Sequence, residues 1–82
     1  GYTYQEAEAA ILKAFGKKMY RLRIELQLSQ EQVAERAQLD RTYVSSVERG
    51  QRNISLLNIC KLAAALEVSP ESLLANLGEC DE

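Results

Sequence analysis

The segment Ser29–Gly50, with the sequence SQEQVAERAQLDRTYVSSVERG, predicts two short helices joined by a tight turn. Ser29 suits a helix N-cap, and Gln32 three residues later completes a capping box. Asp40 can cap a second helix over 41–49, and Gly50 follows where helices commonly end in a left-handed conformation. Two helices with so short a turn predict a helix-turn-helix, a motif whose second helix can enter the major groove of DNA.

The flanking sequence predicts three further helices and no strand. Thr3 opens a capping box for a helix that runs to residue 26, which Gly16 could interrupt. Two more helices are expected over 55–67 and 69–78, the last with a proline at its first position. The expected fold is therefore all-α, with five helices in one domain over 1–82. We expect residues 1–13 to form an N-terminal helical extension and residues 78–82 to form an acidic tail.

Apolar residues at helical spacing supply the expected core. The first helix contributes the stripe Ala7, Ala10, Ile11, Ala14, Phe15, Met19, Leu22 and Leu26. The helix-turn-helix contributes Val33, Ala34, Leu39, Val44 and Val47, and the fourth helix contributes Leu56, Ile59, Cys60, Leu62, Ala63 and Leu66. The last helix adds Leu73, Leu74 and Leu77, whereas Leu57 falls off the core face of the fourth helix.

The distribution of charge favours a basic binding surface more than the net charge of -2 does. Residues 13–52 hold nine Lys/Arg and five Asp/Glu, giving +4, whereas the flanking segments together hold one and seven, giving -6. This asymmetry suits a basic face that meets nucleic acid, with acidic ends kept away from it.

Several classes of protein are not expected from this composition. The chain has no histidine, and its two cysteines are not paired in a CxxC motif, so neither a zinc site nor any other metal site is expected. There is no glycine-rich phosphate loop and no nucleophile motif, so we expect neither an enzyme nor a cofactor. No apolar run is long enough for a membrane span, and two free thiols suit a cytoplasmic protein.

The helix pattern resembles the Cro/cI family of phage-repressor-like DNA-binding domains over roughly residues 15–74. The signature is Leu28-Ser29-Gln30 with Val33-Ala34, followed by Val44 and Val47-Glu48-Arg49-Gly50. The segment Leu39–Asn53 is also similar to the controller proteins of bacterial restriction–modification systems. This resemblance implies a five-helix, lambda-repressor-like fold and a dimeric, sequence-specific transcriptional regulator that binds operators upstream of its own and the endonuclease gene.

Five residues on the expected recognition helix are candidates for reading bases: Arg41, Thr42, Ser45, Ser46 and Arg49. Arginine can donate two hydrogen bonds to guanine, and threonine can contact a base edge or a thymine methyl group. Arg41 could instead pair in solution with Asp40 or Ser45, and Arg49 could simply complement the helix dipole. Of the two serines, one is expected to face DNA, although either could be an ordinary surface residue.

A second set is expected to contact the DNA backbone: Ser29, Gln30, Tyr43, Arg52 and Asn53. Gln30 opens the first helix of the motif, where the family resemblance implies a phosphate contact. Tyr43 could instead be a half-buried packing residue. Glu48 is acidic on a surface meant for DNA, so we expect it to be structural and to pair with Arg36 or Arg49. Arg23 and Lys17 or Lys18, on the first helix, are weaker candidates for contact with the DNA backbone.

A homodimer is expected, because a monomer would contact one half-site only. The candidate interface comprises Ile54, Leu57, Leu74 and Leu77, which could otherwise fill a loose core. Two-fold symmetry would place the recognition helices about 34 Å apart on a near-palindromic operator of double-stranded DNA. The alternatives are a generic phage-type repressor and an antitoxin-like protein-interaction module with the same fold. Neither the operator nor the sign of regulation follows from the sequence.

Overall fold

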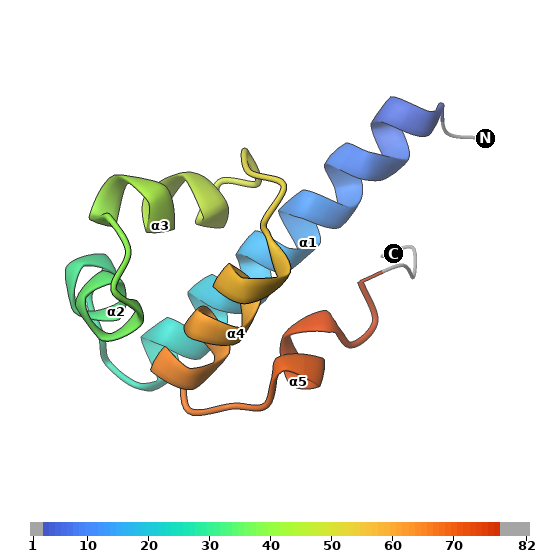
Figure 1. Cartoon of the computed structure of the whole chain (residues 1–82). Helices are drawn as coiled ribbons and strands as arrows, with labels where there is room; N and C mark the ends of the chain where they lie inside the picture. Colours follow the sequence, from blue (N-terminus) through green and yellow to red (C-terminus); the bar gives the residue numbers. More distant parts are fainter. Residues whose placement is uncertain (1–2, 78–82) are drawn as a thin grey trace.

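Five helices follow one another in the computed structural model, which describes residues 3–77 (Figure 1). They are α1 (Tyr4–Glu25), α2 (Gln30–Ala37), α3 (Arg41–Glu48), α4 (Leu56–Ala65) and α5 (Pro70–Leu74), and no strand occurs within that range. The expected all-α fold, with the helix-turn-helix at α2 and α3, is confirmed. The last helix ends at Leu74, four residues before the expected end at Gly78, because the backbone is extended at Ala75. Gly78 itself and the expected acidic tail lie outside the described residues.

Side-chain caps start three of the helices. The side chains of Thr3 and Ser29 each accept a hydrogen bond from the backbone N–H three residues on. The side chain at that position accepts one from the backbone N–H of the cap residue, which completes both capping boxes. Ser55 caps α4 through the N–H of Asn58, whereas Asp40 takes the N-cap position of α3 without a side-chain hydrogen bond. Gly50 has a φ of 75°, the left-handed conformation expected just beyond α3.

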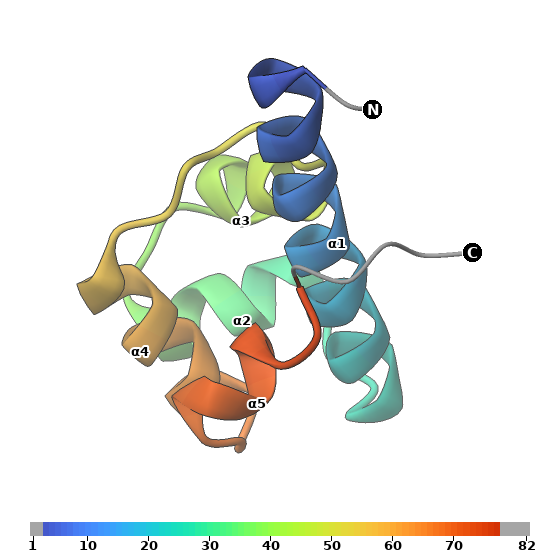
Figure 2. The same cartoon turned by 90° about the vertical axis from the view of Figure 1, so that its right-hand side faces the viewer.

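The core lies where all five helices meet. α1 packs against α3 and α5, α2 against α3 and α4, and α4 against α5. Figure 2 shows α3 beside α1, with α4 and α5 on the other side of α2. The end of α3 lies against Gly16, in the middle of α1. The fully buried large side chains come from every helix: Met19, Val33, Val44, Val47, Leu62, Leu66 and Leu73. This core fixes the angle at which α3 leaves the body.

Gly16 does not interrupt α1; it lets α1 lie against the end of α3. A Cβ atom at this position would lie 2.5 Å from the carbonyl oxygen of Glu48 and 2.6 Å from that of Val47. Since both are backbone atoms, no side-chain rotation could relieve the overlap. Glycine is therefore needed for packing here rather than for helix termination.

The structure corrects the expected core in three places, one in each of α5, α4 and α1. Leu74 of α5 is 43% exposed. Leu56 is exposed because the buried residues of α4 lie in its later turns, which pack against α2 and α5. Cys60 is exposed because it lies with Lys61 and Ala64 on the outer face of α4. Ala10 and Ile11 are exposed because the first turns of α1 protrude beyond the body, as Figure 1 shows. Over the described residues, no helix has both the length and the apolar character that a membrane crossing requires.

Candidate nucleic-acid interface

The first turn of α3 presents Arg41 and Thr42 to solvent. Both side chains are exposed, and Arg41 makes no hydrogen bond or ion pair with Asp40 or Ser45. The structure therefore does not show the alternative in which Arg41 pairs with Asp40 or Ser45. Its five donors remain available at the N-terminal end of the helix, the part that reaches deepest into a groove in this docking geometry.

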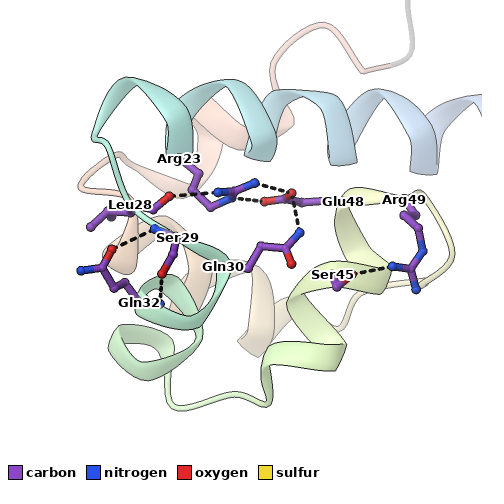
Figure 3. Close-up of polar contacts among 8 residues, drawn as sticks. All are labelled: Arg23, Leu28, Ser29, Gln30, Gln32, Ser45, Glu48 and Arg49. Atoms are coloured by element: carbon purple, nitrogen blue, oxygen red, sulfur yellow. Dashed lines mark hydrogen bonds and ion pairs between the residues drawn. The ribbon is translucent and has the colours of Figure 1, made fainter.

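The last turn of α3 holds Arg49 against its neighbours. Arg49 Nη1 donates to the hydroxyl of Ser45 one turn earlier (Figure 3). Its Nε and Nη2 lie 3.4 and 3.3 Å from Gln51 Oε1. Arg49 is exposed and Ser45 is half-buried. The two residues therefore form one polar group on the outer side of the helix.

Ser46 does not belong to the exposed row, which corrects its place among the base-reading candidates. It is only 7% exposed, and its hydroxyl donates to the carbonyl oxygen of Tyr43 at 2.8 Å. The hydroxyl oxygen of Ser46 also accepts from Arg52 Nε at 3.0 Å. One position on from Ser45, the helix has turned far enough for this side chain to face the body, so Ser46 connects α3 to the following loop.

Tyr43 and Arg52 lie together beside α3. The guanidinium carbon of Arg52 is 5.3 Å from the centroid of the Tyr43 ring, a cation–π distance. The ring packs partly against the core, while its hydroxyl accepts from Asn58 Nδ2 at 3.1 Å. Tyr43 is thus both a packing residue and a surface residue, and Asn58 is a member of this group that the sequence did not suggest. Asn53 is exposed on the same loop.

The N-terminus of α2 contributes Ser29 and Gln30. The Ser29 hydroxyl accepts from the Gln32 N–H at 3.0 Å, so its acceptor is already in use as a cap. The Gln30 side chain is half-buried, and its Nε2 donates to Glu48 Oε1 at 3.0 Å. Gln30 is therefore tied to the end of α3.

The partner of Glu48 is Arg23, and the expected pairing with Arg36 or Arg49 is wrong. Arg23 Nε donates to Glu48 Oε2 at 2.6 Å and Nη2 donates to Oε1 at 3.0 Å, while Nη1 donates to the Leu28 carbonyl oxygen at 2.9 Å (Figure 3). The two side chains are 10% and 6% exposed. This fork-to-carboxylate pair joins α1, α3 and the loop that enters α2.

Glu48 raises the pKa of Arg23 above its ordinary value. The hydrogen bond between the two side chains is the main cause, and burial opposes it by disfavouring the charged form. The guanidinium also lies 5.4 Å from the Tyr20 ring centroid. Arg36, by contrast, makes an exposed pair with Glu67 at 3.2 Å and donates to the Ala65 carbonyl oxygen.

The candidate dimer residues divide into two groups. Leu57 and Leu74 are exposed, at 73% and 43%, whereas Ile54 and Leu77 are partly buried against the core. Leu56, which we expected to be buried, is 71% exposed beside Leu57. The first turn of α4 therefore carries more uncovered apolar surface than the sequence suggested.

Residues 18–73 match the family model described as helix-turn-helix, so the chain belongs to the helix-turn-helix family. It is similar to control protein C.BamHI of Bacillus amyloliquefaciens, with 44% identity over 71 residues that cover 83% of this chain and 88% of that protein. The resemblance to the Cro/cI family and to restriction–modification controllers is thereby confirmed.

Solved structures of restriction–modification controller proteins are also similar to this chain. The restriction–modification controller protein C.AhdI from Aeromonas hydrophila is 53% identical, with a TM-score of 0.74 over 76% of this chain and 94% of that chain. The controller protein C.Esp1396I, solved as a tetramer in complex with its natural 35 base-pair operator, is 31% identical. Its TM-score is also 0.74, over 82% of this chain and 88% of that chain.

Proposed function

We propose that this protein is a sequence-specific transcriptional regulator that binds a near-palindromic operator as a homodimer and controls a restriction–modification system in the cytoplasm. The observation that carries the proposal is the exposed first turn of α3, where Arg41 and Thr42 project from a helix-turn-helix held rigidly by the core. The similarity to controller proteins over most of the chain supports the biological context.

Base contacts and backbone contacts come from different parts of this surface. Arg41 and Thr42 read bases, together with Ser45 and Arg49 from the following turns; Ser46 is left out because it is buried. Tyr43, Arg52 and Asn53 hold the DNA backbone on one side of α3, and Ser29 and Gln30 hold it at the start of α2. Such backbone contacts fix the register of the protein, while the contacts from α3 supply sequence preference.

The dimer forms through the uncovered apolar side chains of α4 and α5. An isologous interface places the same residues of both copies around the two-fold axis, so the apolar surface of Leu57 and Leu74 is buried twice. The two recognition helices then lie about 34 Å apart, one helical turn of DNA.

Selection from a random pool of duplexes tests the function directly. We expect enrichment of one inverted repeat, bound far more tightly than a scrambled duplex of equal length, with affinity that falls steeply as salt increases. Equal binding of selected and scrambled duplexes would contradict sequence recognition and favour the protein-interaction alternative. An adjacent endonuclease and methyltransferase gene would test the restriction–modification context.

Replacing Arg41 by alanine is expected to lower specific affinity by about 1–3 kcal/mol for each half-site and to relax preference at one base pair. The reason is the removal of a bidentate donor that makes no hydrogen bond or ion pair with another side chain of residues 3–77 in the free protein. Titration of the variant against operators altered at each position would locate the affected base pair. Unchanged affinity for the parent operator would mean that Arg41 does not read a base.

Replacing Arg52 by alanine is expected to weaken binding to all DNA sequences about equally, because a contact with a phosphate does not depend on the base. The slope of log affinity against log salt should become shallower by about 0.9 for each phosphate that the variant no longer neutralises, or about 2 for a dimer. Titrations at several salt concentrations with operator and scrambled DNA measure both effects. Weakening confined to the operator would assign Arg52 to base recognition instead.

A further inference from the structure

Glu48 places a carboxylate at the end of the helix that is proposed to face DNA, where a free negative charge would repel phosphates. Its side chain is only 6% exposed. Both oxygens accept hydrogen bonds from Arg23, at 2.6 and 3.0 Å, so its charge is neutralised by a partner from α1. Gly16 makes this possible, because the lack of a Cβ atom lets α1 approach the backbone of Glu48.

The same carboxylate fixes the orientation of the Gln30 amide. Gln30 Nε2 donates to Glu48 Oε1 at 3.0 Å, and Figure 3 shows the amide nitrogen turned toward Glu48. A carboxylate accepts but cannot donate, so the opposite orientation, with the Gln30 oxygen toward Glu48, would be repulsive. One N–H of the amide is used in this bond, and the second remains on the same nitrogen to donate to another group.

We propose that Glu48 is a positioning residue for the DNA-backbone contact of Gln30. By holding the amide nitrogen in place before binding, it removes the cost of ordering a flexible side chain when a phosphate arrives. The bond to an ionised acceptor also polarises the amide and strengthens its second N–H as a donor. This inference rests on the proposed function, because it assigns a role within the same DNA-binding surface.

The substitution Glu48→Gln has opposite expected effects on DNA binding, depending on whether Glu48 acts through its charge or by positioning Gln30. If Glu48 acted on DNA only through its charge, the substitution would tighten binding, since one repulsion with the phosphates would be removed. If it positions Gln30, the substitution should weaken binding, because a glutamine at 48 can present a donor where Gln30 needs an acceptor. The exposed Glu31, on the first turn of α2, provides the matched control for charge.

The test is a double-mutant cycle with Glu48→Gln and Gln30→Met, measured as operator affinity at fixed salt. We expect Glu48→Gln to weaken binding about tenfold in the parent, because one hydrogen bond is impaired at each half-site. In the Gln30→Met background the same change should cause no weakening. Glu31→Gln should tighten binding in both backgrounds. Thermal unfolding of each variant confirms that binding is measured on folded protein, and the side-chain amide resonances of Gln30 report its bond to Glu48 directly.

Equal weakening by Glu48→Gln in both backgrounds would overturn the proposal, as would tighter binding in the parent or no effect of Gln30→Met. If Glu48→Gln does not fold, Glu48→Asp takes its place, since it keeps the charge and withdraws the carboxylate by one methylene; weakening that depends on Gln30 is again required. Failure of the parent to prefer the operator over scrambled DNA would refute the proposed function itself, which is a separate outcome.

Discussion

Replacing Arg23 by leucine is expected to lower the free energy of unfolding by about 3–5 kcal/mol, because it leaves the carboxylate of Glu48 buried without its cation. Arg23 and Glu48 are 10% and 6% exposed, so water cannot replace the missing hydrogen bonds without a change in packing. Small domains are typically stable by only about 5–15 kcal/mol, so the variant should unfold at a much lower denaturant concentration. Urea titration followed by circular dichroism measures the change.

The exposed pair of Arg36 and Glu67 provides the control for this prediction. Their side chains are 44% and 62% exposed, so Glu67→Gln should change stability by less than about 1 kcal/mol. Replacing Arg23 and Glu48 together by leucine should recover part of the stability, because the uncompensated charge is then gone. A destabilisation by Arg23→Leu no larger than that by Glu67→Gln would show that the buried pair is not important for stability.

The helix boundaries were largely predictable because their signals are local. Thr3 and Ser29 form capping boxes with residues only three positions away, and Gly50 terminates α3 through its own backbone conformation. Such signals depend on neighbouring residues in the chain, so the sequence contains them completely. The packing role of Gly16 depends instead on the backbone of α3, more than thirty residues away, and the sequence suggested a possible helix break.

The candidate site was predictable where helical spacing determines which side chains are exposed. It was not predictable where tertiary contacts determine which side chains face inward. Arg41 and Thr42 lie on the exposed face that the pattern indicated. Ser46 was misplaced because adjacent serines give no pattern, and only the contacts with Tyr43 and Arg52 show that it faces inward. Glu48 was correctly expected to be structural, but its partner Arg23 lies 25 residues earlier on another helix. Helical spacing relates only residues within one helix, so it could not indicate this pair.

Replacing Leu57 by aspartate is expected to raise the dimer dissociation constant by at least about 100-fold. Leu57 is 73% exposed in the single chain, so the change should leave the fold of the monomer intact. In an isologous dimer the substitution occurs twice near the same axis, where two carboxylates would be stripped of water and face apolar surface. Sedimentation over a range of concentrations measures the shift, and Ile24→Asp is the matched control, since Ile24 is an exposed apolar residue of α1 outside the proposed interface.

The binding of DNA by the Leu57→Asp variant separates disruption of the dimer from damage to the DNA-binding surface. In the parent, occupation of one half-site brings the second recognition helix to its target at a high effective concentration, so the full operator binds far more tightly than one half-site. In the variant that advantage should disappear, while affinity for an isolated half-site should equal that of parent monomer, because α3 is unchanged. A variant that retains the preference for the full operator would show that the two-fold contact is made elsewhere than at the first turn of α4.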